Sequence, residues 1–175
     1  MSLVIPLGGI ATYPSIVSGD GSYGALLELA SHEWTHQYLA FWPLGQTWGS
    51  SADADTLNET TAEIMGRQLA QVIQAKHPGD FAKGEDGSPP PLPAPTADFN
   101  AVMHSLRLEV DQLLATGKVS EAEQRMDDTQ KYLADHGIYV GKINQAYFAF
   151  YGTYATSPQS SNPIGPKVEK VWSLT

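Results

Sequence analysis

Two histidines and a glutamate lie close together in the segment His32-Glu33-Trp34-Thr35-His36. If this segment is helical, positions i and i+4 share one face, so both imidazoles can reach one metal ion. Glu33 directly follows the first histidine and can accept a proton from a water molecule bound to that ion. The spacing therefore predicts a catalytic Zn²⁺ site in which His32 and His36 are ligands and Glu33 is the general base.

The third ligand of such a site is expected from the acidic run Asn-Glu-Thr-Thr-Ala-Glu at positions 58–63. A catalytic zinc ion takes three protein ligands and keeps one open position, and a carboxylate beside two histidines is a common set. Glu59 and Glu63 are one helical turn apart and face the same way. One can bind zinc while the other accepts a hydrogen bond from a ligand imidazole, and the spacing allows either arrangement.

The pair H-E-W-T-H and N-E-T-T-A-E resembles the gluzincin class of zinc metallopeptidases, the thermolysin-like clan, and the resemblance covers residues 23–75 well. In that class the second helix reads roughly N-E-x-x-[SA]-[DE], with the first Glu as the ligand and the last acid orienting the first His. The resemblance implies that Glu59 is the third ligand and that Glu63 orients His32. Asn58 is then expected beside the ligands. Position 63 carries Glu where Asp is usual.

Tyrosines in the C-terminal part are candidates for stabilising the oxyanion of the reaction. Gluzincins typically take such a group, a His or a Tyr, from their C-terminal helical part. Tyr147 and Tyr151 occur in a run, IYVGKINQAYFAFYGTYA, that is similar to the C-terminal part of bacterial predicted peptidases. The resemblance implies that Tyr147 or Tyr151 enters the cleft. The alternative is that these rings cover the edge of a core while their hydroxyls reach water.

A short extended segment before the metal-binding helix is a candidate for binding the substrate backbone. Residues 4–16 are rich in β-branched and aromatic residues, with Gly and Pro interruptions, which predicts one or two short strands. In gluzincins an edge strand near the site pairs with the substrate, and Gly9, Ile10 and Ala11 are the matching candidates here. A purely structural strand, whose glycines relieve packing, is the alternative.

The elements that position these residues are predicted to be mostly helical. Apolar residues that recur every three or four positions, together with good helix formers, predict helices over about 23–41, 56–76, 98–115, 120–135 and 142–154. A short amphipathic segment is predicted at the end of the chain. The segment 77–97 holds six prolines and three glycines and reads as an exposed, partly polyproline loop or, alternatively, a lid.

The expected fold class is α+β and mostly α, a zincin-like metallopeptidase domain with short N-terminal strands and about five helices. The expected single domain covers residues 1–175. Its parts are extended segments at 1–22, a metal-binding helix pair at 23–76, the proline-rich loop at 77–97 and a helical C-terminal part at 98–175.

Composition narrows the range of partners. The chain has 175 residues, a formal charge of −9 and no cysteine. Its acidity argues against binding nucleic acid, and the absence of cysteine excludes disulfides and thiolate zinc ligands. No run of eighteen apolar residues is present, so no membrane span is expected. The composition is compatible with an extracytoplasmic domain of a membrane-anchored or secreted bacterial protein, and the oligomeric state is left open.

The predicted function is zinc-dependent hydrolysis of a peptide or protein substrate. Two alternatives remain at this point. One is a zinc-stabilised domain without catalytic activity, which has no need of Glu33. The other is a helical interaction module in which the proline-rich loop binds a partner.

Overall fold

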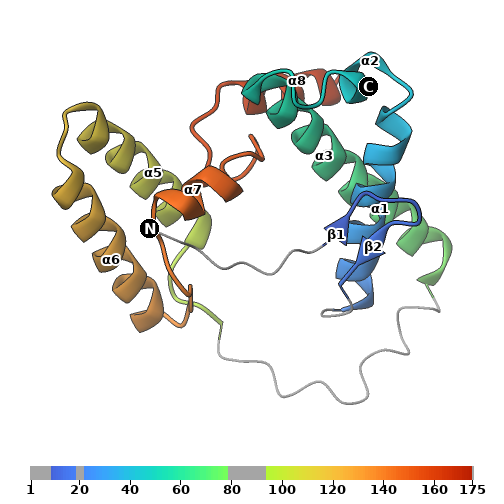
Figure 1. The fold of residues 1–175 in the computed structure, drawn as a ribbon. Helices are drawn as coiled ribbons and strands as arrows, with labels where there is room; N and C mark the ends of the chain where they lie inside the picture. Colours follow the sequence, from blue (N-terminus) through green and yellow to red (C-terminus); the bar gives the residue numbers. More distant parts are fainter. Residues whose placement is uncertain (1–8, 19–21, 79–93, 175) are drawn as a thin grey trace. The chain divides into compact units, whose positions relative to one another are not determined.

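The computed structural model describes residues 9–18, 22–78 and 94–174, which are mostly helical with one short two-stranded sheet (Figure 1). The expectation of a mostly helical chain with short N-terminal strands is therefore confirmed. Two compact units are present, one within Ile5–Pro90 and the other within Pro91–Thr175. The single domain expected over the whole chain stays a prediction. Most of the expected proline-rich loop, 79–93, lies outside the described residues.

The first unit is built on two long helices, α1 (Tyr23–Leu39) and α3 (Ala52–Lys76), which pack against each other. The short helix α2 (Pro43–Gln46) joins them. Ser22 caps α1, and Ser51 caps α3 by accepting a hydrogen bond from the backbone of the first turn. Because Ser51 provides this cap, α3 begins before the start expected near residue 56.

The two long helices lie close to each other where α3 carries Gly66. A β-carbon at this position would lie 3.0 Å from the backbone nitrogen of His32 and 3.1 Å from the carbonyl oxygen of Glu28. The space is therefore filled by the backbone of α1, and a larger residue would force the helices apart. The α3 face toward the interior carries mainly small side chains, and its buried residues are Thr56, Asn58, Thr60, Ala62, Ile64, Gly66 and Ala70.

A two-stranded hairpin lies against α1 (Figure 1). Strand β1 (Gly9–Ile10) pairs antiparallel with β2 (Ile16–Val17), so that the first residue of one strand faces the last residue of the other. The side-chain amide of Gln37, on α1, donates to the carbonyl oxygen of Thr12 at 2.6 Å and fixes the turn of the hairpin to the helix. The hairpin is therefore held beside the segment of α1 that contains His32, Glu33 and His36.

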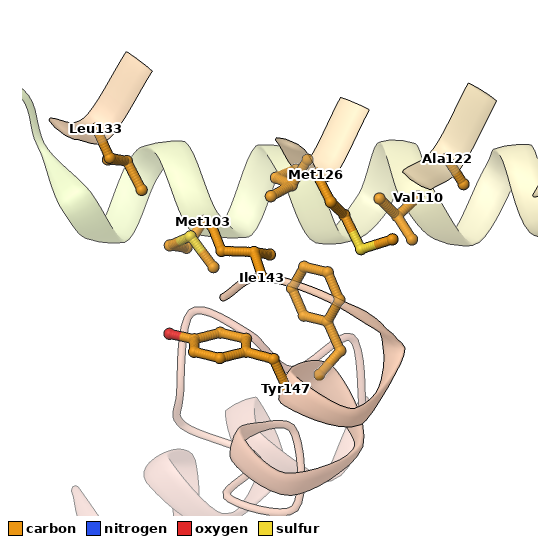
Figure 2. Packing of buried hydrophobic residues seen from close by; sticks show 9 residues of the cluster. Met103, Val110, Ala122, Met126, Leu133, Ile143 and Tyr147 are labelled. Atoms are coloured by element: carbon orange, nitrogen blue, oxygen red, sulfur yellow. The ribbon is translucent and has the colours of Figure 1, made fainter. Parts of the chain in front are cut away.

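The second unit contains α5 (Phe99–Ala115), α6 (Val119–Asp135), α7 (Gln145–Tyr151) and α8 (Ile164–Trp172). Helices α5 and α6 pack along each other. Gly117 adopts φ 74° in the turn between them, a left-handed conformation that glycine adopts without a steric penalty. Figure 2 shows how side chains of α5 and α6 meet others from the segment that contains α7; the buried cluster is Met103, Leu106, Val110, Ala122, Met126, Leu133, Ile143, Tyr147 and Phe148.

Other helix boundaries, and the number of helices, also differ from the sequence expectation. Helix α7 begins after Asn144, whose side chain accepts a hydrogen bond from the backbone of Tyr147, so it is shorter than the expected 142–154. Helix α6 begins at Val119, one residue before the expected start, and Lys118, which precedes it, provides no side-chain cap. The described residues form seven helices instead of about five, since α2 and the terminal α8 also count as helices.

Within the described residues, no helix has both the length and the apolar character that crossing a membrane requires.

Candidate metal centre

Three side chains from α1 and α3 converge on one point. The Nε2 atoms of His32 and His36 are 3.0 Å apart. Glu59 Oε2 lies 3.4 Å from Nε2 of the first histidine and 3.5 Å from Nε2 of the second. Among the residues that the structure describes, this is the one group of three or more His, Cys, Asp or Glu side chains whose ligand atoms all lie within 4.8 Å of one another.

The size of this triangle fits a zinc ion. Ligand atoms bound to Zn²⁺ at 2.0–2.1 Å with tetrahedral angles lie about 3.3 Å from one another. The observed separations of 3.0, 3.4 and 3.5 Å bracket that value. The three side chains are only 13–16% exposed. Two imidazole nitrogens and a carboxylate oxygen directed at one point need a cation or a shared proton between them, because their lone pairs otherwise repel.

Asn58 fixes the ring of His36 in an orientation suited to binding a metal ion through Nε2. Its Oδ1 lies 2.7 Å from His36 Nδ1, and its Nδ2 donates to the carbonyl oxygen of Leu44 at 3.4 Å. Both contacts agree on the orientation of the amide, so Oδ1 is the acceptor and His36 Nδ1 carries the proton. In the neutral ring the lone pair is then on Nε2, the atom directed at His32 and Glu59.

The electrostatic interactions within the cluster favour the ionised form of Glu59 and the protonated form of His36. Burial opposes ionisation of Glu59, but the hydrogen bonds from His32 and His36 outweigh burial and lower its pKa to about 2. Burial likewise disfavours the charged form of His36, yet the hydrogen bond to Glu59 and its negative charge leave the pKa of that imidazole raised. A bound cation would take over the positive charge that a protonated imidazole supplies here.

Glu33 is buried beside the cluster, with 6% of the residue exposed. Burial raises the pKa of its carboxyl group, and the opposing attraction of His32 and His36 does not cancel that effect. Strand β1 accounts for part of this burial, because a β-carbon added at Gly9 would overlap the Glu33 carboxylate. A carboxyl group whose pKa is raised toward neutrality is suited both to accept and to deliver a proton.

Trp48 is a neighbour of the cluster that was not predicted from the sequence. Its ring meets the ring of His36 edge-on, with centroids 6.0 Å apart and planes at 70°. It follows α2 closely and precedes the cap of α3, and no spacing rule in the sequence links it to the metal-binding motif. Only the packing of α1 against the segment between α2 and α3 brings it beside His36.

The remaining site residues predicted for the first unit are Ile10, Ala11 and Glu63, which are not among the three clustered side chains. Ile10, in β1, and the following Ala11 are exposed beside α1. Glu63 is one turn beyond Glu59 on α3, and its Oε1 lies 3.9 Å from Arg67 Nη2. Its proposed contact with His32 stays a prediction.

Both candidate tyrosines belong to the second unit. Tyr147 is buried in the core of that unit (Figure 2), and its hydroxyl accepts a hydrogen bond from Gln159 Nε2 at 3.2 Å. Tyr151 packs against it, with ring centroids 4.5 Å apart. Burial raises the pKa of the Tyr147 phenol. A role for either tyrosine at the metal centre stays a prediction.

None of the protein-family models, curated proteins or solved structures compared with the chain matches it. The geometry of the cluster of His32, His36 and Glu59 is therefore the basis on which a function can be proposed.

Proposed function

We propose that this chain is a zinc-dependent peptidase of the gluzincin type, with His32, His36 and Glu59 as the zinc ligands. The observation that carries the proposal is the convergence of two Nε2 atoms and one Oε2 atom at separations of 3.0–3.5 Å. A buried glutamate next to the first of these histidines supports catalysis in addition to binding, because a purely structural zinc site does not need it.

The residues divide the chemistry between them. A bound zinc ion would lower the pKa of water and polarise the substrate carbonyl. Glu33 accepts the proton of the attacking water and then delivers it to the leaving amine. Asn58 holds the His36 ring in the tautomer that leaves Nε2 free to coordinate. Glu63 supports His32 in the same manner, in keeping with the gluzincin pattern.

Strand β1 is the proposed site for the substrate backbone. It lies against α1, and Gly9 is so close to the Glu33 side chain that a β-carbon there would have to displace it. An extended peptide that adds to this strand at Gly9, Ile10 and Ala11 would therefore pass close to the general base. The proposal also includes a zincin-like scaffold and an oxyanion-stabilising hydroxyl from Tyr147 or Tyr151.

The experiment that tests this function compares zinc content and peptide hydrolysis in the parent and in Glu33→Gln. The parent should bind one equivalent of zinc and cleave an unstructured protein such as casein. Glu33→Gln should retain the zinc but lose at least a hundredfold in turnover, since general acid–base catalysis typically contributes about 10²–10⁴. Glu28→Gln, an exposed glutamate one turn before the motif on the same helix, is the matched control and should cleave like the parent.

Three results would contradict the proposal in different ways. Equal turnover in Glu33→Gln removes Glu33 from the mechanism. A parent protein that binds zinc but cleaves no peptide supports a zinc-stabilised domain without catalytic activity. A parent protein whose stability is unchanged by chelation and that contains no zinc supports a helical interaction module.

A further inference from the structure

Trp48 is a half-exposed aromatic ring that forms one side of the metal centre. It is 52% exposed, and its ring meets His36 edge-on at 6.0 Å. Three other exposed aromatic side chains of this unit pack on one another: Trp34 stacks on Tyr38, and Tyr38 contacts Trp42. A single exposed aromatic ring is common on protein surfaces, so the position of Trp48 beside a ligand of the metal centre is what distinguishes it.

The backbone of Trp48 is held in place on both sides. Its amide donates to the carbonyl oxygen of Gly45 at 3.2 Å. The next amide, that of Gly49, donates to Asp55 Oδ1 on the first turn of α3 at 2.6 Å. Gly49 has φ 77°, so the turn uses a conformation that other residues adopt only with strain. These contacts tie the turn to both α2 and α3.

The same segment is linked directly to the metal centre. The carbonyl oxygen of Leu44 receives hydrogen bonds from Thr47 Oγ1 at 3.0 Å and from Asn58 Nδ2 at 3.4 Å. The other end of the Asn58 amide accepts the hydrogen bond from His36. The backbone that carries Trp48 is therefore tied to the segment that holds the His36 ring, which keeps the indole beside the ligands, as a surface that selects a substrate group requires.

We propose that Trp48 forms the apolar wall of a substrate subsite and selects peptides with an aromatic side chain next to the cleaved bond. This inference depends on the proposed function, because it concerns a substrate of the same centre. An indole that keeps half of its surface exposed offers its face and edge to another ring, and aromatic pairs are favourable in offset or edge-to-face geometry. Binding sites of this kind combine a few polar groups with apolar walls.

The test measures binding of two metal-chelating probes to the zinc-loaded full chain by calorimetry. Acetohydroxamic acid carries only a methyl group, and phenylacetohydroxamic acid carries a phenyl ring in addition. We expect the phenyl compound to bind the parent about tenfold more tightly, as burial of a ring against an indole predicts. Trp48→Ala should lose most of this ratio while its affinity for acetohydroxamic acid stays unchanged, and Trp48→Phe should retain it.

Trp42→Ala is the matched control, since Trp42 is 51% exposed and packs against Tyr38. It should keep the full ratio. An unchanged ratio in zinc-loaded Trp48→Ala overturns the inference. Loss of zinc from Trp48→Ala also overturns it, because Trp48 would then support the metal centre and not the substrate.

The probes also separate this inference from the proposed function, because their binding does not require hydrolysis. A parent that binds zinc, prefers the phenyl probe and cleaves no peptide contradicts the proposed function and supports the subsite. A parent that cleaves peptides and binds both probes equally contradicts the subsite alone. A parent that binds no zinc contradicts both.

Discussion

Replacement of Gly66 by alanine should weaken zinc binding as well as the packing of α1 against α3. A β-carbon at this position would lie 3.0–3.1 Å from backbone atoms of His32 and Glu28. Ordinary van der Waals contact of a β-carbon begins at about 3.4 Å, so the backbone of α1 must move away from α3 by a few tenths of an ångström. The proposed zinc ligands come from both helices, and the distances from such ligands to the ion tolerate a change of only about 0.2 Å.

The magnitude follows from two opposing effects on stability. Overpacking typically costs about 1–3 kcal/mol, whereas alanine is favoured over glycine inside a helix by about 1 kcal/mol. The free energy of unfolding should therefore fall by about 0–2 kcal/mol. Zinc affinity should fall by at least about tenfold, because Glu59 on α3 moves away from His32 and His36 on α1.

Zinc titration with a competing chelator measures the affinity, and urea unfolding of the zinc-free protein measures the stability. Gly141→Ala is the control, since a β-carbon added there meets nothing within 4 Å. A zinc affinity of Gly66→Ala equal to that of the parent, with normal folding, would refute the reasoning that the α1–α3 contact sets the ligand geometry.

Three further predictions concern the neighbours of the cluster. Asn58→Ala should lower zinc affinity about 10–100-fold, because His36 loses the acceptor that fixes its ring, and Asn58→Asp should restore most of it in the same titration. Gly9→Ala should retain one equivalent of zinc and lose about tenfold or more in turnover, since the new β-carbon overlaps the Glu33 carboxylate; unchanged hydrolysis would refute this. The zinc-free protein should lose stability at both ends of the pH range. The pKa of Glu59 is lowered from 4.5 to about 2, so its contribution is present above pH 4.5 and is lost as the pH falls toward 2. The pKa of His36 is raised from 6.5, so its contribution is present below that pH and is lost as the pH rises through the raised value. Urea unfolding across pH 2–9 checks both limbs, and a flat profile would contradict the coupling of these two groups.

Local spacing was sufficient to predict some features of the site. The i, i+4 pair His32 and His36 lies on α1 as expected, since a run of good helix formers surrounds it. Spacing alone did not decide whether Glu59 or Glu63 is the third ligand, because both lie on one face of the same helix. Only the register of α3 against α1, fixed where Gly66 meets the backbone of His32, places Glu59 Oε2 beside both imidazoles.

Features that depend on tertiary packing could not be predicted from spacing. Trp48 reaches His36 through the turn between α2 and α3, and that turn depends on the hydrogen bond from Gly49 to Asp55. The start of α3 depends on the cap that Ser51 provides, whose side chain accepts a hydrogen bond from the backbone amide of Ala54. Tyr147 and Tyr151 are four residues apart, as expected for one face of a helix. This spacing is the same whether the rings lie in a core or in a substrate cleft, so it could not distinguish the two.

Zinc K-edge X-ray absorption of the purified chain tests the central claim most directly. One equivalent of zinc should be bound, with two imidazole nitrogens and one carboxylate oxygen at about 2.0–2.2 Å and a further oxygen in the open position. His36→Ala should lose the zinc, whereas His104→Ala, on α5 in the other unit, should keep it. A spectrum without imidazole ligands, or a full equivalent of zinc retained by His36→Ala, would contradict the account.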